Sequence, residues 1–160
     1  MPISDALIEL LDAKQIDYQL INHAEITNVE AGLATLHDVA AESVIKTIGF
    51  DAAGQSVFVA LQGPQKIDYG KLSRVLGIKR SKLRMLAADV VEQELGYQVG
   101  GLSPLHVDNK IHVYFDQAVA KLTIVYCGIG VRNRTLKLAA HDLIAAANGK
   151  LADLVRPEPN

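Results

Sequence analysis

The sequence is poor in disulfide-forming residues and in large aromatic residues: its 160 residues include one cysteine, Cys127, eight aromatic residues and no tryptophan. A single cysteine can form no internal disulfide and cannot assemble a cysteine-based zinc site. The N-terminus lacks the cationic start and apolar core of a signal peptide, and no apolar run approaches the roughly 18 residues that span a bilayer. These absences predict a soluble protein of a reducing compartment, the cytoplasm, with no membrane partner.

Neither sign of charge dominates the chain, whose formal net charge is −2 with 21% charged and 49% apolar residues. The molecule as a whole is therefore not a polycation that would coat nucleic acid or an acidic membrane. Its length and apolar content predict one globular domain with its own core. We expect that domain to cover residues 1–155, with the proline-containing residues 156–160 forming a tail or the start of a linker.

Apolar spacing and turn residues predict a mixture of helices and strands. Strands are expected at 18–21, 44–50, 56–61, 111–115, 122–126 and 135–138, the second and third of them forming a hairpin. Helices are expected after a Ser4 cap, at 27–36, between an Asp68 cap and Gly77, at 88–95 and at 141–147. Because strands and helices do not alternate strictly, the pattern favours a single α+β domain with a mixed, curved β-sheet flanked by helices.

Several familiar catalytic arrangements are missing from the sequence. The five histidines have neither helical nor strand spacing to one another, so neither a metal site nor a cofactor is expected. Cys127 fits a small buried residue better than a nucleophile, and Ser103 lacks the strand-turn-helix elbow of a hydrolase serine. Gly128 and Gly130 resemble half of a dinucleotide fingerprint without its third glycine, which favours close backbone packing beside a pocket.

Lys46 is a cation inside an otherwise apolar predicted strand. Strand alternation places it on the same face as Val44 and Ile48. If these residues line a pocket, burial of the ammonium disfavours its charged form and lowers its pKa. The alternative is an edge-strand lysine that discourages aggregation.

The segment Gly100–Pro104 predicts a rigid loop of exposed backbone. Glycines at 100 and 101 permit positive φ and close approach, so successive amides can point inward at an anion or an oxyanion. Leu102 and Ser103 continue the loop, and Pro104 restricts one end. The alternative is an ordinary turn between a helix and a strand.

Basic residues gather in the stretch from Lys66 to Arg84, which holds seven cations and one carboxylate in a chain of net charge −2. Such a local excess can bind phosphates while the rest of the protein is acidic, although it can also be a solvated face. The candidate contacts are Lys71, Arg74, Lys79, Arg80 and Lys82.

Several of these segments together resemble a known family. They are 44–48 before a hairpin, 66–72 leading to Leu76 and Gly77, 96–105, Asp116 after a strand, the glycine loop near Gly130, and 138–143. In order and spacing they are similar to YbaK/EbsC-type aminoacyl-tRNA editing domains, which are related to the insertion domain of bacterial prolyl-tRNA synthetases. The resemblance covers roughly residues 20–155.

This resemblance implies an α+β fold and trans-acting hydrolysis of mischarged aminoacyl-tRNA, typically mischarged tRNA for proline. It implies that Lys46 is the residue most closely tied to activity. The implied substrate-binding residues are His23, Gly128, Gly130 and the loop from Gly100 to Pro104. Aminoacyl-tRNA is then the partner, an RNA and not DNA, with prolyl-tRNA synthetase as the candidate protein partner and no metal required.

Two positions depart from the family pattern of cysteine-clearing members. Ile21 stands where these members tend to carry an aromatic residue, and Gly128 stands where they tend to carry a serine. These departures weaken the case for cysteine as the amino acid removed, and a small aliphatic or hydroxylated residue such as alanine, threonine or serine fits the pattern as well. Our hypothesis is that Lys46 and the amides of residues 101–103 polarise the ester, and that water or a ribose hydroxyl attacks it.

Two other functions compatible with these residues are kept open. One is a non-catalytic module that binds an amino acid or aminoacyl ligand and reports to a signalling domain. The other is an RNA-binding protein without a pocket.

Overall fold

The computed structural model describes residues 2–25 and 39–157. The helix expected at 27–36 lies outside these ranges. The described elements, in chain order, are α1 (Ile3–Ala13), β1 (Tyr18–Asn22), η1 (Ala41–Ser43), β2 (Val44–Ala52), β3 (Gln55–Gln62), α3 (Tyr69–Leu76), η2 (Arg80–Lys82), β4 (Leu83–Met85), η3 (Val90–Glu94), β5 (His112–Asp116), η4 (Gln117–Lys121), β6 (Ile124–Gly128), β7 (Arg134–Ala139), α4 (Ala140–Ala146) and β8 (Lys150–Ala152). None of the helices in the described ranges is long and apolar enough to cross a membrane.

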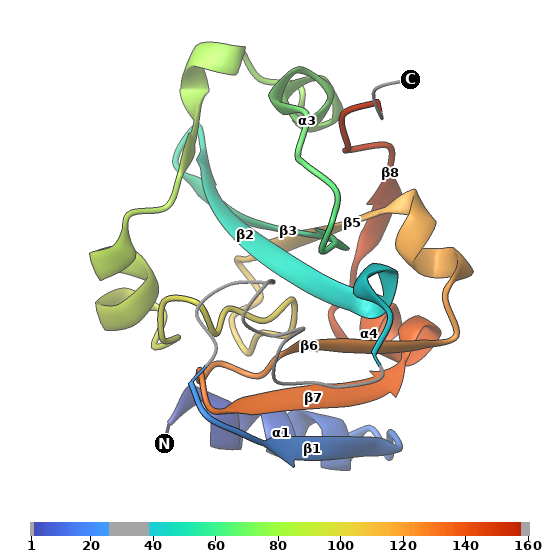
Figure 1. Cartoon of the computed structure of the whole chain (residues 1–160). Coiled ribbons are helices and arrows are strands. Elements are labelled where there is room, and N and C mark those ends of the chain that lie inside the picture. The colour runs from blue at the N-terminus through green and yellow to red at the C-terminus, as the bar shows by residue number, and fades with distance from the viewer. Residues whose placement is uncertain (1, 26–38, 158–160) are drawn as a thin grey trace.

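The strands form one mixed sheet in the order β1-β7-β6-β2-β3-β5-β8. The short β4 also pairs with β2, on the same side as β6 but at the other end of the strand. The β2–β3 hairpin is antiparallel, whereas β2 pairs with β6 and β3 pairs with β5 in parallel. Figure 1 shows the long β2 crossing the molecule diagonally above β6, β7 and β1. This arrangement confirms the expected α+β domain with a mixed sheet.

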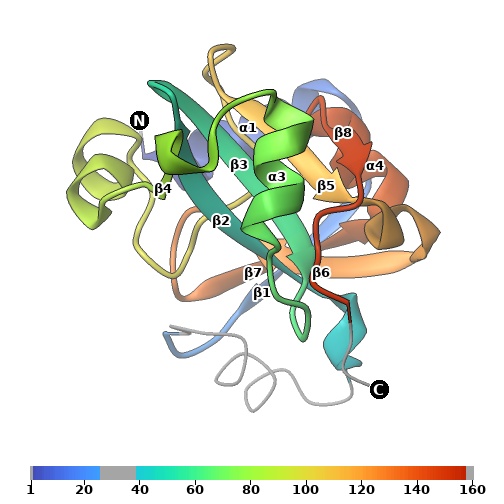
Figure 2. The same ribbon diagram turned by 90° about the horizontal axis from the view of Figure 1, so that it is seen from above.

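The two faces of the sheet are covered by different helices. Leu7 and Leu11 of α1 and Leu143 of α4 are buried in one apolar cluster, and Leu72 of α3 is buried in a second. Figure 2 shows α3 crossing one face of β2 and β3, with α1 and α4 behind the sheet. Ile45 belongs to the first cluster and Phe50 to the second, as alternation along β2 requires.

Most of the expected elements are present, and the local signals for α3 are confirmed. Asp68 Oδ1 accepts a 3.0 Å hydrogen bond from the amide of Lys71, and Gly77 ends the helix with φ of +68°. The Ser4 cap is wrong: Pro2 is the N-cap of α1, and Ser4 is buried inside the helix. Proline suits a helix start because its fixed φ and missing N–H cost nothing there.

Other differences concern short elements. The segment expected as a helix at 88–95 forms a π-helical turn over Val90–Glu94. The three-residue strands β4 and β8 are too short for a sequence pattern to reveal. The sixth strand begins two residues later than expected, at Ile124.

Candidate functional site

The candidate site adjoins an interruption along one edge of β2. On one side, β2 pairs with β3 over 45–52. On the other side it pairs with β6 only at 44–45 and with β4 only at 50–52. Among the described strands, none pairs with Lys46, Thr47 or Ile48 on that side. Figure 1 shows β2 and β6 diverging there, with the loop around residue 100, in yellow, between them.

The glycine loop and the segment after β6 are joined through their backbones. The amide of Gly130 donates to the carbonyl of Gly101 at 2.8 Å, and the amide of Gln98 donates to the carbonyl of Gly130 at 2.9 Å. Gly100 and Gly130 have φ of +88° and +91°, where side chains are strained. The structure therefore brings together two of the glycine motifs that the sequence singled out.

The close approach leaves no room for side chains at two of these glycines. A Cβ at Gly101 would lie 2.8–2.9 Å from the backbone of Val131. A Cβ at Gly128 would lie 2.9 Å from the carbonyl oxygen of Gly101 and closer still to that of Leu102. Because backbone atoms cannot turn aside as a flexible side chain can, glycine at 128 lets the loop lie directly against β6.

His23 reaches the same group of residues through Thr135. Its Nδ1 lies 2.6 Å from the carbonyl oxygen of Ala24 and its Nε2 lies 2.7 Å from the hydroxyl of buried Thr135. A carbonyl can only accept, so Nδ1 carries the proton and, in the neutral ring, Nε2 accepts from Thr135. Thr135 is paired with Gly128 across β6 and β7. His23 is therefore connected through Thr135 to the strand residue against which the glycine loop packs.

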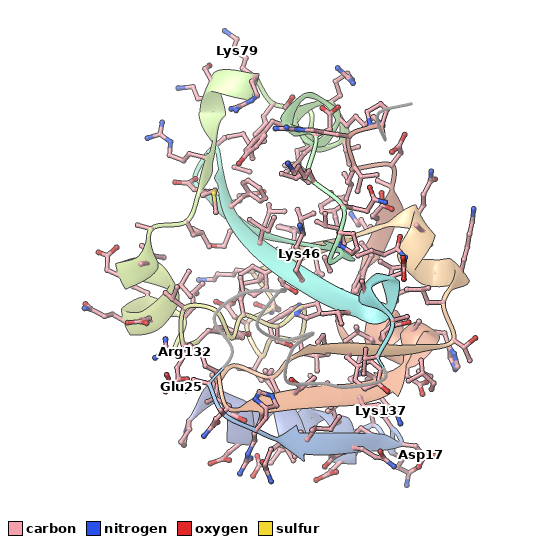
Figure 3. The ribbon with its side chains drawn as sticks, viewed as in Figure 1. Asp17, Glu25, Lys46, Lys79, Arg132 and Lys137 are labelled. Carbon is pink, nitrogen blue, oxygen red and sulfur yellow. The ribbon has the colours of Figure 1, made fainter. Side chains whose placement is uncertain are left out.

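Lys46 projects from the face of β2 that is turned away from the glycine loop. Alternation places its side chain on the face of Ile48 and Phe50, while Thr47 and Gly49 face the loop, where a Cβ on Gly49 would meet Leu102. Figure 3 shows Lys46 beside the middle of β2.

The electrostatic environment of Lys46 disfavours its charge. No carboxylate of the described residues forms a salt bridge with its ammonium. Partial burial, with a smaller contribution from the nearby cation of Lys66, lowers the pKa of Lys46 below its ordinary value. An anion or a polarised carbonyl would relieve both effects.

The backbone donors of the loop are only partly available. The amide of Gly101 donates to the carbonyl of Gln98 at 2.8 Å, whereas those of Leu102 and Ser103 have no partner within the described ranges. Our hypothesis that residues 101–103 all donate to the ester is therefore restricted to Leu102 and Ser103. The hydroxyl of Ser103 is fully buried and accepts from the amide of Leu105 at 3.1 Å, a structural role, and Pro104 is buried beside it.

Arg132 is a residue that the sequence analysis missed. Its guanidinium donates to the carbonyl of Val99 at 2.9 Å, and its amide donates to the side chain of Gln98 at 2.8 Å. Its Nε lies 3.6 Å from the carboxylate of Glu25 (Figure 3). Arg132 thus fastens the glycine loop, although no short motif surrounds it in the sequence.

Some cations of the basic stretch are bonded to other groups of the protein, and others are exposed to solvent. Lys71 is bound to Asp153 at 3.0 Å and to the carbonyl of Val155 at 2.8 Å, so it secures the C-terminal segment. Arg80 donates to the carbonyl of Leu83 and lies over the ring of Tyr69 at 4.3 Å. Arg74, Lys79 and Lys82 are exposed, and Figure 3 places Lys79 at the far end of the molecule from Lys46.

An open cleft of about 430 Å³ lies between the turn that joins β2 to β3 and the end of this stretch. It is lined by Asp51, Ala53, Gly54, Lys82 and Arg84. The amide of Gly54 already donates to Asp51, which leaves the two cations as the groups available to an anion.

Cys127 is not available as a nucleophile in this structure. Cys127 is buried, and burial raises the pKa of its thiol to about 12, so it stays protonated at neutral pH. Within the described ranges, no three residues among His, Cys, Asp and Glu are grouped so that they could hold a metal ion.

Solved structures share this fold over nearly the whole chain. One is titled "hypothetical protein APE2540". It superimposes with a TM-score of 0.83 at 24% sequence identity, and the match covers 94% of this chain and 99% of the chain of that structure. Another is titled "putative trans-editing enzyme for prolyl tRNA synthetase". It superimposes with a TM-score of 0.84 at 17% sequence identity, and the match covers 98% of this chain and 99% of the chain of that structure. At these identities the likeness establishes the fold.

Sequence comparison finds relatives at 26% identity. One is the uncharacterized protein YwhH of Bacillus subtilis, over 74% of this chain and 78% of that protein. Another is the "Putative Cys-tRNA(Pro)/Cys-tRNA(Cys) deacylase EbsC" of Enterococcus faecalis, where the match covers 64% of this chain and 61% of that protein. A third is the proline–tRNA ligase of Lactiplantibacillus plantarum, of which the chain matches 23%. The family model described as aminoacyl-tRNA editing domain matches residues 23–146, most of the chain. The chain therefore belongs to the aminoacyl-tRNA editing domain family.

Proposed function

We propose that this protein is a trans-acting deacylase that hydrolyses the ester of mischarged aminoacyl-tRNA, with mischarged tRNA for proline as the substrate class. Family membership and the names of the relatives support this function. The observation that carries it is Lys46 itself: a partly buried ammonium without a carboxylate partner in the described ranges, on the strand that lies beside the glycine loop (Figure 1). Such a site suits a ligand that brings negative charge.

The chemistry that these groups support is polarisation of the ester carbonyl. Lys46 and the amides of Leu102 and Ser103 donate to the carbonyl oxygen as negative charge develops on it. Water attacks the carbonyl carbon, assisted by a ribose hydroxyl of the substrate that accepts its proton and passes it on. The bond to the ester oxygen breaks, that oxygen leaves as a protonated ribose hydroxyl of the tRNA, and the free amino acid is released. One donor aimed at such an oxyanion is typically worth roughly 3 kcal/mol of barrier. The proposal needs neither a metal nor a protein nucleophile.

The position of the loop bears on the amino acid removed. Gly128 lets the carbonyls of Gly101 and Leu102 lie against β6, so a side chain at 128 would widen the separation between loop and strand. We propose that the amino acid removed has a small aliphatic or hydroxylated side chain, as in alanine, serine or threonine, and that the separation between loop and strand limits its size. Discrimination by one methylene is worth only about 1–3 kcal/mol, so small differences in loop position matter.

We further propose that the exposed cations contact the RNA backbone. Ala52 is paired with Leu83 and lies six residues beyond Lys46, about 20 Å along the strand at roughly 3.3 Å per residue. Lys79, Lys82 and Arg84 surround that end of β2. We propose that the acceptor stem runs from these residues toward Lys46, in the cytoplasm where translation supplies such a substrate.

A panel of mischarged tRNAs tests this function. Each tRNA carries a labelled amino acid, and its release is followed with and without the protein, with correctly charged prolyl-tRNA as the comparison. We expect release from alanyl-, seryl- or threonyl-tRNA for proline and sparing of prolyl-tRNA. If no member of the panel is hydrolysed, the deacylase proposal is wrong and the non-catalytic binding module replaces it.

A further inference from the structure

The backbone of β2 points alternately to its two neighbours. The carbonyl of Val44 accepts from Gly63 at 2.7 Å on the β3 side, and the carbonyl of Gly49 accepts from Leu86 at 2.9 Å on the opposite side. Successive residues of a strand direct their N–H and C=O groups to opposite sides. The backbone groups of Ile45, Thr47 and Gly49 therefore point away from β3.

Thr47 is the member of this set without a neighbour in the described part of the chain. Ile45 pairs with Cys127 of β6, and Gly49 is bonded to Leu86 just before the β4 pairing begins. Between them, the described residues supply no partner for the N–H or C=O of Thr47. The interruption in the sheet is thus one ladder position long.

The side chain of Thr47 is also unsatisfied. Its hydroxyl oxygen is buried and has no hydrogen-bond partner among the described residues. Leaving a buried polar group unpaired is costly, and each such group in a native structure calls for an explanation, such as a role in binding a ligand. The N–H, C=O and hydroxyl of Thr47 are therefore all unpaired with respect to residues 2–25 and 39–157.

We infer that the aminoacyl group of the substrate occupies this position by pairing with Thr47 as one added residue of a β-strand, an inference that rests on the proposed deacylase function. An aminoacyl ester carries an α-ammonium donor and a carbonyl acceptor separated by one Cα, like the N–H and C=O of a strand residue. In an antiparallel pair, two opposed residues exchange both of these bonds. The carbonyl of Thr47 accepts from the α-ammonium, and the amide of Thr47 donates to the ester carbonyl.

The surrounding residues fit this placement. The Thr47 hydroxyl, on the face turned to Leu102, accepts a second hydrogen of the ammonium. Lys46 projects from the other face, so a group lying along the open edge has the loop on one side and the lysine on the other. Main-chain pairing gives affinity for any amino acid, and the flanking side chains select among them.

The first experiment separates the hydroxyl's binding role from a structural one. Thr47→Val keeps the shape and removes the hydroxyl, and Thr47→Ser restores it. We expect Thr47→Val to raise KM for mischarged tRNA about tenfold, with Thr47→Ser near wild type. Ser4→Ala, which removes another buried and unpaired hydroxyl on α1, is the matched control and should leave activity unchanged. Neither Thr47→Val nor Ser4→Ala should lower the unfolding midpoint, since each removes an unsatisfied group. Unchanged KM in Thr47→Val would overturn the hydroxyl's role.

The second experiment reads the backbone pairing directly and does not require turnover. The probe is adenosine bearing a 3′-alanylamide, which cannot be hydrolysed as an ester. In the free protein we expect the Thr47 amide proton to exchange with solvent faster than those of Lys46 and Ile48, which point to β3. Saturation with the probe should slow Thr47 exchange about tenfold or more and shift its NMR resonance downfield. Unchanged Thr47 exchange under saturation, or no binding of the probe, would overturn the pairing.

The two experiments distinguish failure of this inference from failure of the proposed function. Turnover by wild type with no response at Thr47 would leave the deacylase and remove the pairing. Absence of turnover on every mischarged tRNA, with Thr47 protected by the probe, would remove the deacylase and support Thr47 as the aminoacyl-binding residue of a binding module.

Discussion

The amide of Gly130 donates a 2.8 Å hydrogen bond to the carbonyl oxygen of Gly101, which joins two glycine segments that lie almost thirty residues apart in the sequence. Arg132 strengthens the same junction through the carbonyl of Val99. The glycine loop is therefore held in place by β6 and the turn after it. A substitution on β6 should consequently shift the position of the loop.

Replacement of Gly128 tests this dependence. In Gly128→Ser, the new Cβ would meet the carbonyl oxygens of Gly101 and Leu102, so the loop must move away. Overpacking of this kind typically costs about 1–3 kcal/mol, and we expect that loss in the free energy of unfolding, measured with denaturant. Deacylation of the small-residue substrate should fall about tenfold because Leu102 and Ser103 are displaced.

Gly54→Ala is the control for a backbone effect without a collision. Gly54 has φ of +92°, and a Cβ there would meet nothing within 4 Å. This variant should lose stability through backbone strain while retaining activity, since Gly54 lies at the far end of β2. If Gly128→Ser matched wild type in both stability and rate, the tight junction between loop and strand would be wrong.

The exposed cations should contribute to RNA affinity in a salt-dependent way. Removal of one cation that binds a phosphate reduces the slope of log K against log salt by roughly 1. We therefore expect the double variant Lys79→Ala/Lys82→Ala to bind tRNA more weakly and to show a slope lower by about 2. Fluorescence anisotropy across a salt series measures both quantities.

Lys71→Ala provides the contrasting case for this stretch. Lys71 is engaged with Asp153 and Val155, so its removal should lower stability and leave the salt slope close to wild type. A slope unaffected by removal of Lys79 and Lys82 would contradict their binding of phosphates.

The environment of Lys46 predicts a pH-dependent effect on stability. Burial lowers its pKa in the folded protein below 10.5, so between these two pKa values the unfolded chain binds more protons. The penalty for holding the charged lysine is therefore full at neutral pH and disappears as the pH rises to 10.5. Lys46→Met should raise the free energy of unfolding at pH 7, by less than about 1 kcal/mol because solvent screens a half-exposed cation. The gain should vanish near pH 10.5, and a gain independent of pH would argue against this cause.

The sequence predicted the elements that have strong local signals. Asp68 and Gly77 mark the two ends of α3 through capping, and alternation along 44–50 identified a strand whose lysine lies among apolar neighbours. The family motifs also brought forward the two glycine segments before any contact between them was visible. Such signals are local, or depend on matching motifs along the chain.

Contacts between distant segments could not be predicted in the same way. Whether the amide of Gly101 is free depends on Gln98, and the anchoring by Arg132 depends on how the chain turns after β6. The position at Thr47 that the described strands leave unpaired depends on where β6 diverges from β2 and on β4 having only three residues, of which Met85 lies nearest the gap. Ser4 is of a residue type that often caps the N-terminus of a helix, yet in this fold it is a buried residue of α1.

The rate of ester hydrolysis by Lys46→Ala tests the central claim most directly. The measurement is single-turnover release of labelled amino acid from mischarged tRNA for proline, with Ser4→Ala as the control variant and circular dichroism to show that each protein is folded. If Lys46 stabilises the charge that develops on the ester carbonyl, Lys46→Ala should lose about 100-fold in rate while Ser4→Ala stays near wild type. A folded Lys46→Ala protein that deacylates at the wild-type rate would contradict the account.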